Sequence, residues 1–140
     1  MRDLQNAIAL LERTPVALDA LLSGLPEFWT RQNEGEKTWS ALDVVGHLIH
    51  CDVDDWMPRT KRILAEGGSQ PFDAFDRWGH VRLVEGKSMG ELLDEFAARR
   101  AVNLKELRGL GLRGGYGKAW RASGIGPGDA RTIAGDVGRA

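Results

Sequence analysis

Apolar residues recur at steps of three and four positions in three long stretches of the chain. This spacing places them on one face of an α-helix. The helices expected from it span residues 2–23, 40–65 and 88–109. No stretch alternates between apolar and polar residues with the period of a β-strand. The pattern therefore predicts an all-α fold without a sheet.

Two of the expected helices begin with the same capping pattern. Ser40 is followed by Asp43, and Ser88 is followed by Glu91. In such a capping box the serine side chain accepts a backbone N–H from the first turn, and the acidic side chain accepts the N–H of the serine. We therefore expect sharp helix starts at both serines.

Proline residues interrupt two of the helical patterns. Pro15 lies inside the first expected helix and predicts a break there. Pro58 lies inside the second and predicts a bend, because its ring removes one backbone hydrogen bond and crowds the carbonyl of residue 54.

The segments between the helices are expected to be loops. Residues 28–39 are too rich in turn residues for a helix and too irregular for a strand. Residues 70–87 form a second loop, with a short helical turn around residues 77–84. The aromatic residues of the loop 72–80, together with His80, are interpreted as a lid packed over a helix end; lining a pocket mouth is the alternative.

Beyond Leu110 the apolar periodicity ends. Residues 111–140 are rich in Gly, Ala and Arg and contain few large apolar side chains, so we predict a poorly ordered tail there. The predicted helical domain is therefore residues 1–110. Three amphipathic helices leave an apolar side that a further element or a second copy must cover. We expect a homodimer for that reason.

The net charge and the cysteine content limit which classes of partner and which cellular compartment we expect. The formal charge of −1 provides no bulk attraction for nucleic acid or for an anionic membrane, so neither is expected as a partner. No apolar run reaches the roughly 18 residues that a membrane-spanning helix needs. The single cysteine cannot form an internal disulfide, which favours a reducing, cytoplasmic location.

Candidate chemical groups gather on one side of the second expected helix. Asp43, His47, His50 and Asp54 lie on neighbouring turns, with Cys51 beside them. From spacing alone, His47 is interpreted as a core histidine and His50 as structural or partly exposed. Two ligands from one helix would give only weak, open coordination of zinc or nickel. Cys51 is interpreted as a small buried hydrophobe rather than a nucleophile.

We expect the other polar and aromatic residues of this region to have structural roles rather than chemical ones. Asp52, Asp54 and Asp55 are expected to form a solvated face. Trp39 and Trp56 are expected to pack in the core.

Residues 38–59, TWSALDVVGHLIHCDVDDWMPR, resemble the DinB-like family of four-helix-bundle proteins. The segments PFDAFDR at 71–77 and SMGELLDEFAARRAVNLKEL at 88–107 are similar to the third helix of that family and its approach. The resemblance covers about residues 1–110. It implies a DinB-like up-down helical bundle in which three helices are recognisable, with an atypical Gly/Arg/Ala-rich tail in place of the fourth.

The resemblance also implies a divalent metal held by three histidines. His47 stands at the position of the ligand on the second helix. The other two ligands come from a His-x-x-x-His pair on the fourth helix, but no histidine follows His80 in this chain. We hypothesise that a frameshift near codon 110, in the gene or in its determination, replaced the fourth helix.

The expected metal site is therefore incomplete. His47 is predicted as a metal ligand of low occupancy and His50 as a weak one, with Zn or Ni bound only if the missing ligands are supplied. Relatives implied by the resemblance include thiol-dependent transferases and isomerases that use low-molecular-weight thiols. The predicted function is a DinB-like protein of unassigned activity, related to those enzymes but inactive as it stands. The alternative is a non-catalytic helical interaction or dimerisation module.

Overall fold

The computed structural model describes residues 2–67 and 71–112. These residues form six helices and no strand, which confirms the all-α prediction for this part of the chain. The helices are α1 (Arg2–Leu22), α2 (Glu27–Arg31), α3 (Ala41–Asp54), α4 (Trp56–Glu66), α5 (His80–Val84) and α6 (Met89–Gly109). None of the helices described is long and apolar enough to span a membrane. We predict poor order for the tail, residues 111–140. Residues 113–140 lie outside the described ranges.

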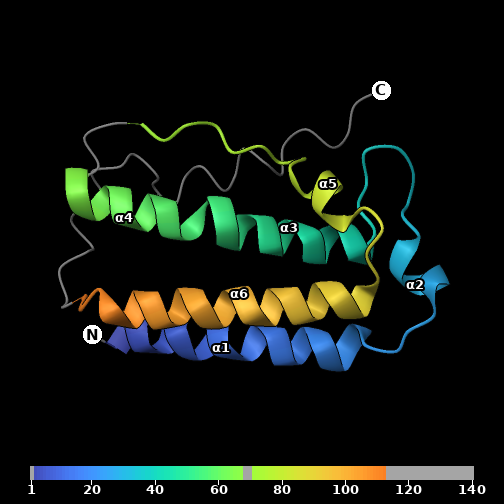
Figure 1. The fold of residues 1–140 in the computed structure, drawn as a ribbon, viewed down its shortest axis with the longest axis horizontal. Coiled ribbons are helices and arrows are strands. Elements are labelled where there is room, and N and C mark those ends of the chain that lie inside the picture. The colour runs from blue at the N-terminus through green and yellow to red at the C-terminus, as the bar shows by residue number, and fades with distance from the viewer. Residues whose placement is uncertain (1, 68–70, 113–140) are drawn as a thin grey trace, which may run out of the picture. The chain divides into compact units, whose positions relative to one another are not determined.

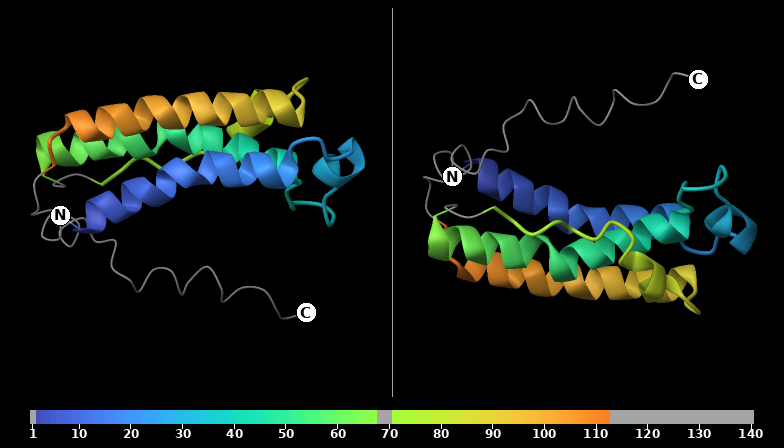
Figure 2. Two further views of the ribbon diagram at one scale, coloured as in Figure 1. Left: turned by 90° about the horizontal axis from the view of Figure 1, so that it is seen from below. Right: turned by 90° about the horizontal axis from the view of Figure 1, so that it is seen from above.

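The described residues fall into two compact units. Residues 2–58 and 74–112 belong to the first, and residues 59–67 and 71–73 belong to the second. Within the first unit, α6 packs against both α1 and α3, and α5 packs against α3. Helices α3 and α6 run in the same direction and α1 runs opposite to them (Figure 1). The up-down order implied by the resemblance therefore does not hold between α3 and α6. The turned views show the same three long helices side by side (Figure 2).

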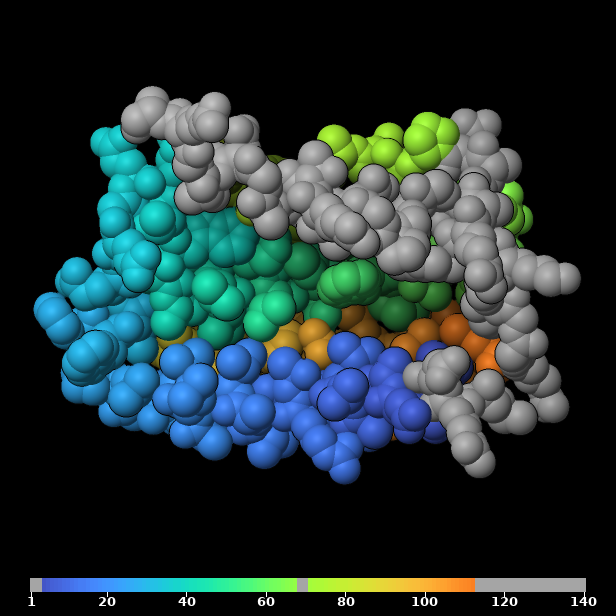
Figure 3. All heavy atoms as spheres, turned by 180° about the vertical axis from the view of Figure 1, so that it is seen from behind, coloured from blue at the N-terminus to red at the C-terminus, as the bar shows by residue number. Residues whose placement is uncertain are grey.

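The core of the first unit lies between α3 and α6. Val45 and Ile49 on α3, and Leu92 and Phe96 on α6, are completely buried. Burying one such side chain stabilises the fold by about 1.5–3 kcal/mol. Seen from behind, α6 is visible in the seam between α1 and α3 (Figure 3). The periodic apolar positions of these helices therefore face one another as the sequence predicted.

Both predicted capping boxes are present. Ser40 Oγ accepts the N–H of Asp43 at 3.2 Å, and Asp43 Oδ2 accepts the N–H of Ser40 at 2.9 Å. At the start of α6, Ser88 Oγ accepts the N–H of Glu91 at 3.3 Å, and Glu91 Oε2 accepts the N–H of Ser88 at 2.8 Å. These bonds satisfy backbone donors that the first turn of a helix leaves without partners.

The predicted break at Pro15 is wrong, because α1 continues through it. A proline inside a helix deprives the carbonyl four residues earlier of its hydrogen bond. Here that carbonyl belongs to Leu11, and it accepts a hydrogen bond from Arg100 Nη1 of α6 at 3.3 Å. A tertiary contact thus replaces the bond that Pro15 removes.

The prediction that residues 28–39 hold no helix is also wrong. The short helix α2 begins directly after Pro26, whose φ of −57° suits the entry into a helix. Thr30 of α2 is buried, and Arg31 donates a hydrogen bond to the Lys87 carbonyl at 3.1 Å. Tertiary contacts therefore stabilise a helix of only five residues, which local preference does not reveal.

The expected continuous helix over 40–65 is two helices, α3 and α4, separated at Asp55. Asp55 is the C-cap of α3, and its N–H still donates to the Cys51 carbonyl at 3.1 Å. Pro58 then lies in the first turn of α4, where a backbone N–H has no partner within the helix. The effect of Pro58 is therefore a break three residues before it, rather than a bend at the proline itself.

Three side chains of this region differ from their predicted environments. Asp52 and Asp55 are buried rather than part of a solvated face, whereas Asp54 is exposed as predicted. Asp52 is buried because it forms an ion pair with Arg100 on α6. Trp56 is 56% exposed and does not pack in the core.

Candidate functional site

Helix α3 and the segment leading into α5 bring the three histidines of the chain together. His47 and His50 lie one turn apart on α3, and His80 is the first residue of α5. Helix α5 approaches α3 closely because Gly46 has no side chain; a Cβ there would overlap with Cγ1 of Val84. We call His47, His50 and His80, together with Trp39 and Phe75, the histidine cluster.

His50 is held at both ring nitrogens. Nδ1 lies 2.9 Å from Asp54 Oδ2, and Nε2 lies 3.0 Å from the carbonyl oxygen of Asp76. Gly79 lies so close to the ring that a Cβ there would overlap with it. His50 thus anchors the segment before α5 to α3. Because both nitrogens are engaged, this arrangement does not favour the predicted role of His50 as a weak metal ligand.

His47 has one engaged nitrogen and one without a partner. Nε2 lies 3.5 Å from Cys51 Sγ. Nδ1 is buried and has no hydrogen-bond partner among the described residues. Burial lowers the pKa of His47, and the nearby His80, His50 and Arg77 lower it further. The ring is therefore neutral near pH 7, the form in which imidazole binds metals.

His80 is completely buried. Its Nδ1 lies 3.1 Å from the Arg77 carbonyl oxygen, and since a carbonyl only accepts, Nδ1 carries the proton. Nε2 lies 3.7 Å from Asp43 Oδ1 and has no hydrogen-bond partner within the described part of the chain. His80 therefore places a buried imidazole against α3. The interpretation of the loop 72–80 as a lid over a helix end stays a prediction.

Aromatic rings hold the two imidazoles of His47 and His80 in place. The ring of Trp39 lies 4.6 Å from that of His47 and 4.7 Å from that of His80, measured between ring centroids. Phe75 lies 5.7 Å from His47, and the ring of Trp78 stacks on His80 at 6.0 Å. Trp39 thus packs against the histidines and is only half-buried.

Cys51 is buried, as predicted for a small hydrophobe. Its sulfur faces an imidazole that is neutral near pH 7. A thiolate is favoured by a neighbouring cation, and a neutral ring does not supply one. The His47–Cys51 pair therefore lacks the charge arrangement of an activated nucleophile.

A three-histidine metal centre of the kind implied by the resemblance does not fit the residues present. His47 suits one ligand position, with a half-buried, neutral ring whose buried Nδ1 has no hydrogen-bond partner among the described residues. The sequence contains no histidine after His80 that could supply the other two ligands. Across residues 2–67 and 71–112, no group of three or more His, Cys, Asp or Glu is arranged to hold a metal ion.

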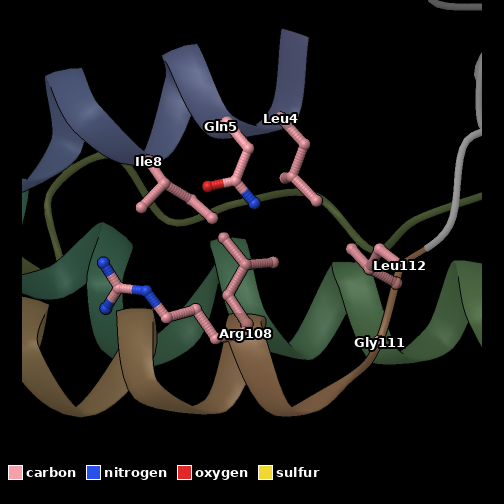
Figure 4. A pocket seen from close by; sticks show the side chains of 7 residues that line it. Leu4, Gln5, Ile8, Arg108, Gly111 and Leu112 are labelled. Carbon is pink, nitrogen blue, oxygen red and sulfur yellow. The ribbon is translucent and has the colours of Figure 1, made fainter. Parts of the chain in front are cut away.

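A pocket of about 180 Å³ lies elsewhere, between the start of α1 and the end of α6 (Figure 4). Leu4, Gln5 and Ile8 project into it from α1, opposite Arg108. The Arg108 guanidinium binds the Glu12 carboxylate. The lining contains neither histidine nor cysteine, so this pocket offers no imidazole or thiol as a metal ligand or nucleophile.

Comparison with known proteins identifies the family. A model of the DinB superfamily matches residues 10–137. This range contains the histidine cluster and most of the predicted tail. No curated protein matches the chain. Because the family match covers most of the sequence, the chain belongs to the DinB superfamily.

Proposed function

We propose that this chain is a divergent DinB-superfamily protein related to divalent-metal, thiol-dependent transferases and isomerases, without their complete three-histidine metal centre. The observation that carries the proposal is the state of His47. It stands where the resemblance places a ligand, and its buried Nδ1 has no hydrogen-bond partner among the described residues, while the sequence provides no His-x-x-x-His pair beyond it.

The remaining histidines support the same conclusion. Both nitrogens of His50 already have oxygen partners. His80 offers a single nitrogen, Nε2, because Nδ1 binds the Arg77 carbonyl. In a complete centre the metal would lower the pKa of a bound thiol or water. We do not assign that contribution to this chain, and we propose no catalytic residue.

Metal content tests this proposal directly. The protein would be purified without chelators, and its zinc, nickel and manganese would be measured by emission spectrometry together with protein concentration. We expect far less than one ion per chain, because fewer than three protein ligands hold a metal weakly. One ion per chain that survives gel filtration would contradict the proposal.

The origin of the missing ligands has its own test. The gene would be resequenced from about codon 100 to beyond its stop codon and translated in all three frames. If another frame encodes an amphipathic helix with His-x-x-x-His, the frameshift hypothesis is supported and the restored protein should retain metal. If no frame encodes that pair, the segment is authentic and the frameshift hypothesis is discarded.

We also propose a second candidate function, a helical dimerisation module, and base it on apolar side chains at the junction of α1 and α2. Leu21, Phe28 and Trp29 are each about two-thirds exposed, at 67%, 65% and 67%. We propose a second copy of the chain as the partner of these residues. Sedimentation would compare the wild type with Phe28→Ser/Trp29→Ser, using Val102→Ser on α6 as the control. A monomeric wild type would contradict this candidate.

A further inference from the structure

Helix α1 carries a second stripe of apolar and small residues beside the one that faces the core. On the core side, Ile8 is buried, and Leu18 and Leu22 pack against the core residues of α3 and α6. The second stripe, which we call the outer stripe, consists of Ala7, Leu10, Thr14, Ala17 and Leu21. It lies about 100° around the helix from the core side, because each residue of an α-helix turns the chain by that angle. Two such stripes are typical of a helix that packs against two neighbours.

The outer stripe is exposed in the part of the chain that the structure describes. Leu10 and Leu21 are 69% and 67% exposed, and Ala7 and Ala17 are exposed as well. Thr14 is the polar member of the stripe, and its hydroxyl donates a hydrogen bond to the Leu10 carbonyl at 3.0 Å. The stripe can therefore be buried without leaving this hydroxyl donor unpaired.

The spacing of the outer stripe suits an antiparallel pair of identical helices. Its residues follow one another by three, four, three and four positions, which are the steps between the contact positions of a coiled coil. In an antiparallel pair, Leu10 lies opposite Leu21 of the second copy, and Thr14 lies opposite Ala17 of that copy. Each contact occurs twice, as a two-fold interface requires. The larger side chains fall at the two ends of the contact and the smaller ones at its centre.

The sequence argues against the C-terminal segment of the same chain as the partner of this stripe. The outer stripe spans residues 7–21, so a helix that matches it needs about 15 residues. Residues 113–140 contain eight glycines and one proline, and no run free of both is longer than six residues. Glycine and proline are the least favourable residues in the interior of a helix. A second copy of α1 meets the requirement for length.

We propose that α1 pairs with α1 of a second copy in antiparallel orientation along the outer stripe. Because α2 follows the end of α1, this pairing places α2 of each copy beside the first turns of α1 in the other. Phe28 and Trp29 then lie at the edge of the same interface. The pairing rests on the dimerisation module proposed above and adds to it the helix, the direction and the register of the contact.

The exposed apolar area is sufficient for such a pair. Phe28 and Trp29, 65% and 67% exposed, together present roughly 200–330 Å², since one aromatic side chain buries about 150–250 Å². Leu10 and Leu21 add about 40–80 Å² each, on the scale that converts transfer free energy into area. The total of roughly 280–490 Å² per copy compares with about 450 Å² of apolar surface on each side of a standard interface.

Chemical crosslinking tests the orientation and the register. Leu10→Cys and Leu21→Cys would be prepared as separate proteins and treated with a short bis-maleimide, each alone and after mixing. We expect a covalent dimer only in the mixture, because antiparallel pairing separates the two copies of either position by roughly 16 Å along the helix axis. Crosslinking of each variant with itself, or no crosslinking in the mixture, would overturn the proposal.

Two controls accompany the crosslinking. The wild type is the blank, because its cysteine, Cys51, is buried. Val102→Cys replaces a side chain on α6 that is 63% exposed, comparable to Leu10. Its mixture with Leu10→Cys should yield no covalent dimer. Equal crosslinking in that mixture would mean that the reagent reports random collisions, which would also count against the pairing.

A charge introduced at the centre of the outer stripe provides a second measurement. Ala17→Glu should weaken dimerisation at least about tenfold, because the interface would then bury carboxylates without partners. Ala98→Glu, at an exposed position of α6, is the matched control and should leave the dimer intact. Circular dichroism should be unchanged in both variants, since both positions are exposed. A dimer of unchanged strength in Ala17→Glu would overturn the pairing.

The outcomes separate this pairing from the dimerisation module on which it rests. A wild type that sediments as a monomer contradicts both. A dimer that dissociates in Phe28→Ser/Trp29→Ser but persists in Ala17→Glu contradicts only the α1 pairing, because α2 then forms the contact without the outer stripe. Dissociation in Ala17→Glu together with crosslinking confined to the mixture supports the antiparallel pair.

Discussion

Both carboxylate oxygens of Asp52 on α3 accept hydrogen bonds from the guanidinium of Arg100 on α6, Oδ2 from Nε at 2.7 Å and Oδ1 from Nη2 at 3.0 Å. The two side chains are only 3% and 8% exposed. A third nitrogen of Arg100 donates to the Leu11 carbonyl of α1. One buried arginine therefore links the three long helices of the first unit.

Replacing Arg100 should strongly destabilise the fold. In Arg100→Met, the Asp52 carboxylate is left buried without its partner and the Leu11 carbonyl loses its donor. We expect the free energy of unfolding to fall by about 3–5 kcal/mol, as measured by urea denaturation at pH 7. The exposed neighbour provides a control, since Arg99→Met should change stability by no more than about 0.5 kcal/mol.

The double variant Asp52→Leu/Arg100→Met identifies the origin of that loss. Replacing both partners of a buried ion pair by apolar residues is often neutral or stabilising. We therefore expect the double variant to recover most of the stability lost in Arg100→Met. Equal stability of the single and double variants would mean that the loss arises from packing rather than from an unpaired charge.

Gly46 should tolerate no side chain while Val84 is present. In an ordinary helix, Gly→Ala gains about 1 kcal/mol. Here the added Cβ overlaps with Val84 Cγ1, and valine has little rotamer freedom with which to move away. We expect Gly46→Ala to lower the free energy of unfolding by about 1–3 kcal/mol.

Two further variants check this explanation in the same urea experiment. In a Val84→Ala background, the added Cβ no longer meets Cγ1. Gly46→Ala should then lower the free energy of unfolding much less. Gly90→Ala on α6 is the matched control, because nothing lies near its added Cβ. A cost for Gly46→Ala that is unchanged by Val84→Ala would refute the steric explanation.

Gly79 should be required for the position of His50. A Cβ at residue 79 would overlap with Nε2 and Cε1 of the His50 ring. We expect Gly79→Ala to displace that ring, to break its hydrogen bond to the Asp76 carbonyl, and to lower the melting temperature. The imidazole ¹⁵N resonances of His50 report the displacement. An unchanged His50 spectrum in the variant would argue against this close approach.

The long helices and their capped starts could be predicted because their signals are local. Steps of three and four place Val45 and Ile49 on one face, and a serine followed by an acidic residue marks a helix start. The short helix α2 was missed because contacts distant in sequence stabilise it, among them Arg31 to the Lys87 carbonyl.

The Asp52–Arg100 pair was missed although a signal for it exists. Asp52 follows Ile49 by three positions, and Arg100 follows Phe96 by four, so each lies on the apolar face of its helix. A charged residue on each of two facing apolar surfaces predicts a buried pair. Asp52 was instead grouped with its neighbours Asp54 and Asp55, and this grouping led to the wrong prediction that it faces solvent.

The candidate site was predicted in part. The helical pattern placed His47, His50 and Cys51 near one another, but spacing could not show that Asp76 and Gly79 engage His50. Nothing in the local pattern of residues 72–80 indicates that His80 is buried against α3. That contact depends on the close packing of Gly46 and Val84, which is a tertiary property.

Acid should weaken the start of α6 through Glu91. The backbone N–H of Ser88, followed by its hydroxyl, lowers the pKa of Glu91 below its usual 4.5. The unfolded chain therefore takes up this proton first as pH falls. The stabilisation from the charged carboxylate is present above about pH 4.5 and is lost as pH falls through the folded-state pKa. Urea denaturation should show Glu91→Gln less stable than the wild type at pH 7, with a difference that shrinks towards pH 3. A constant difference across this range would contradict the role of the charge.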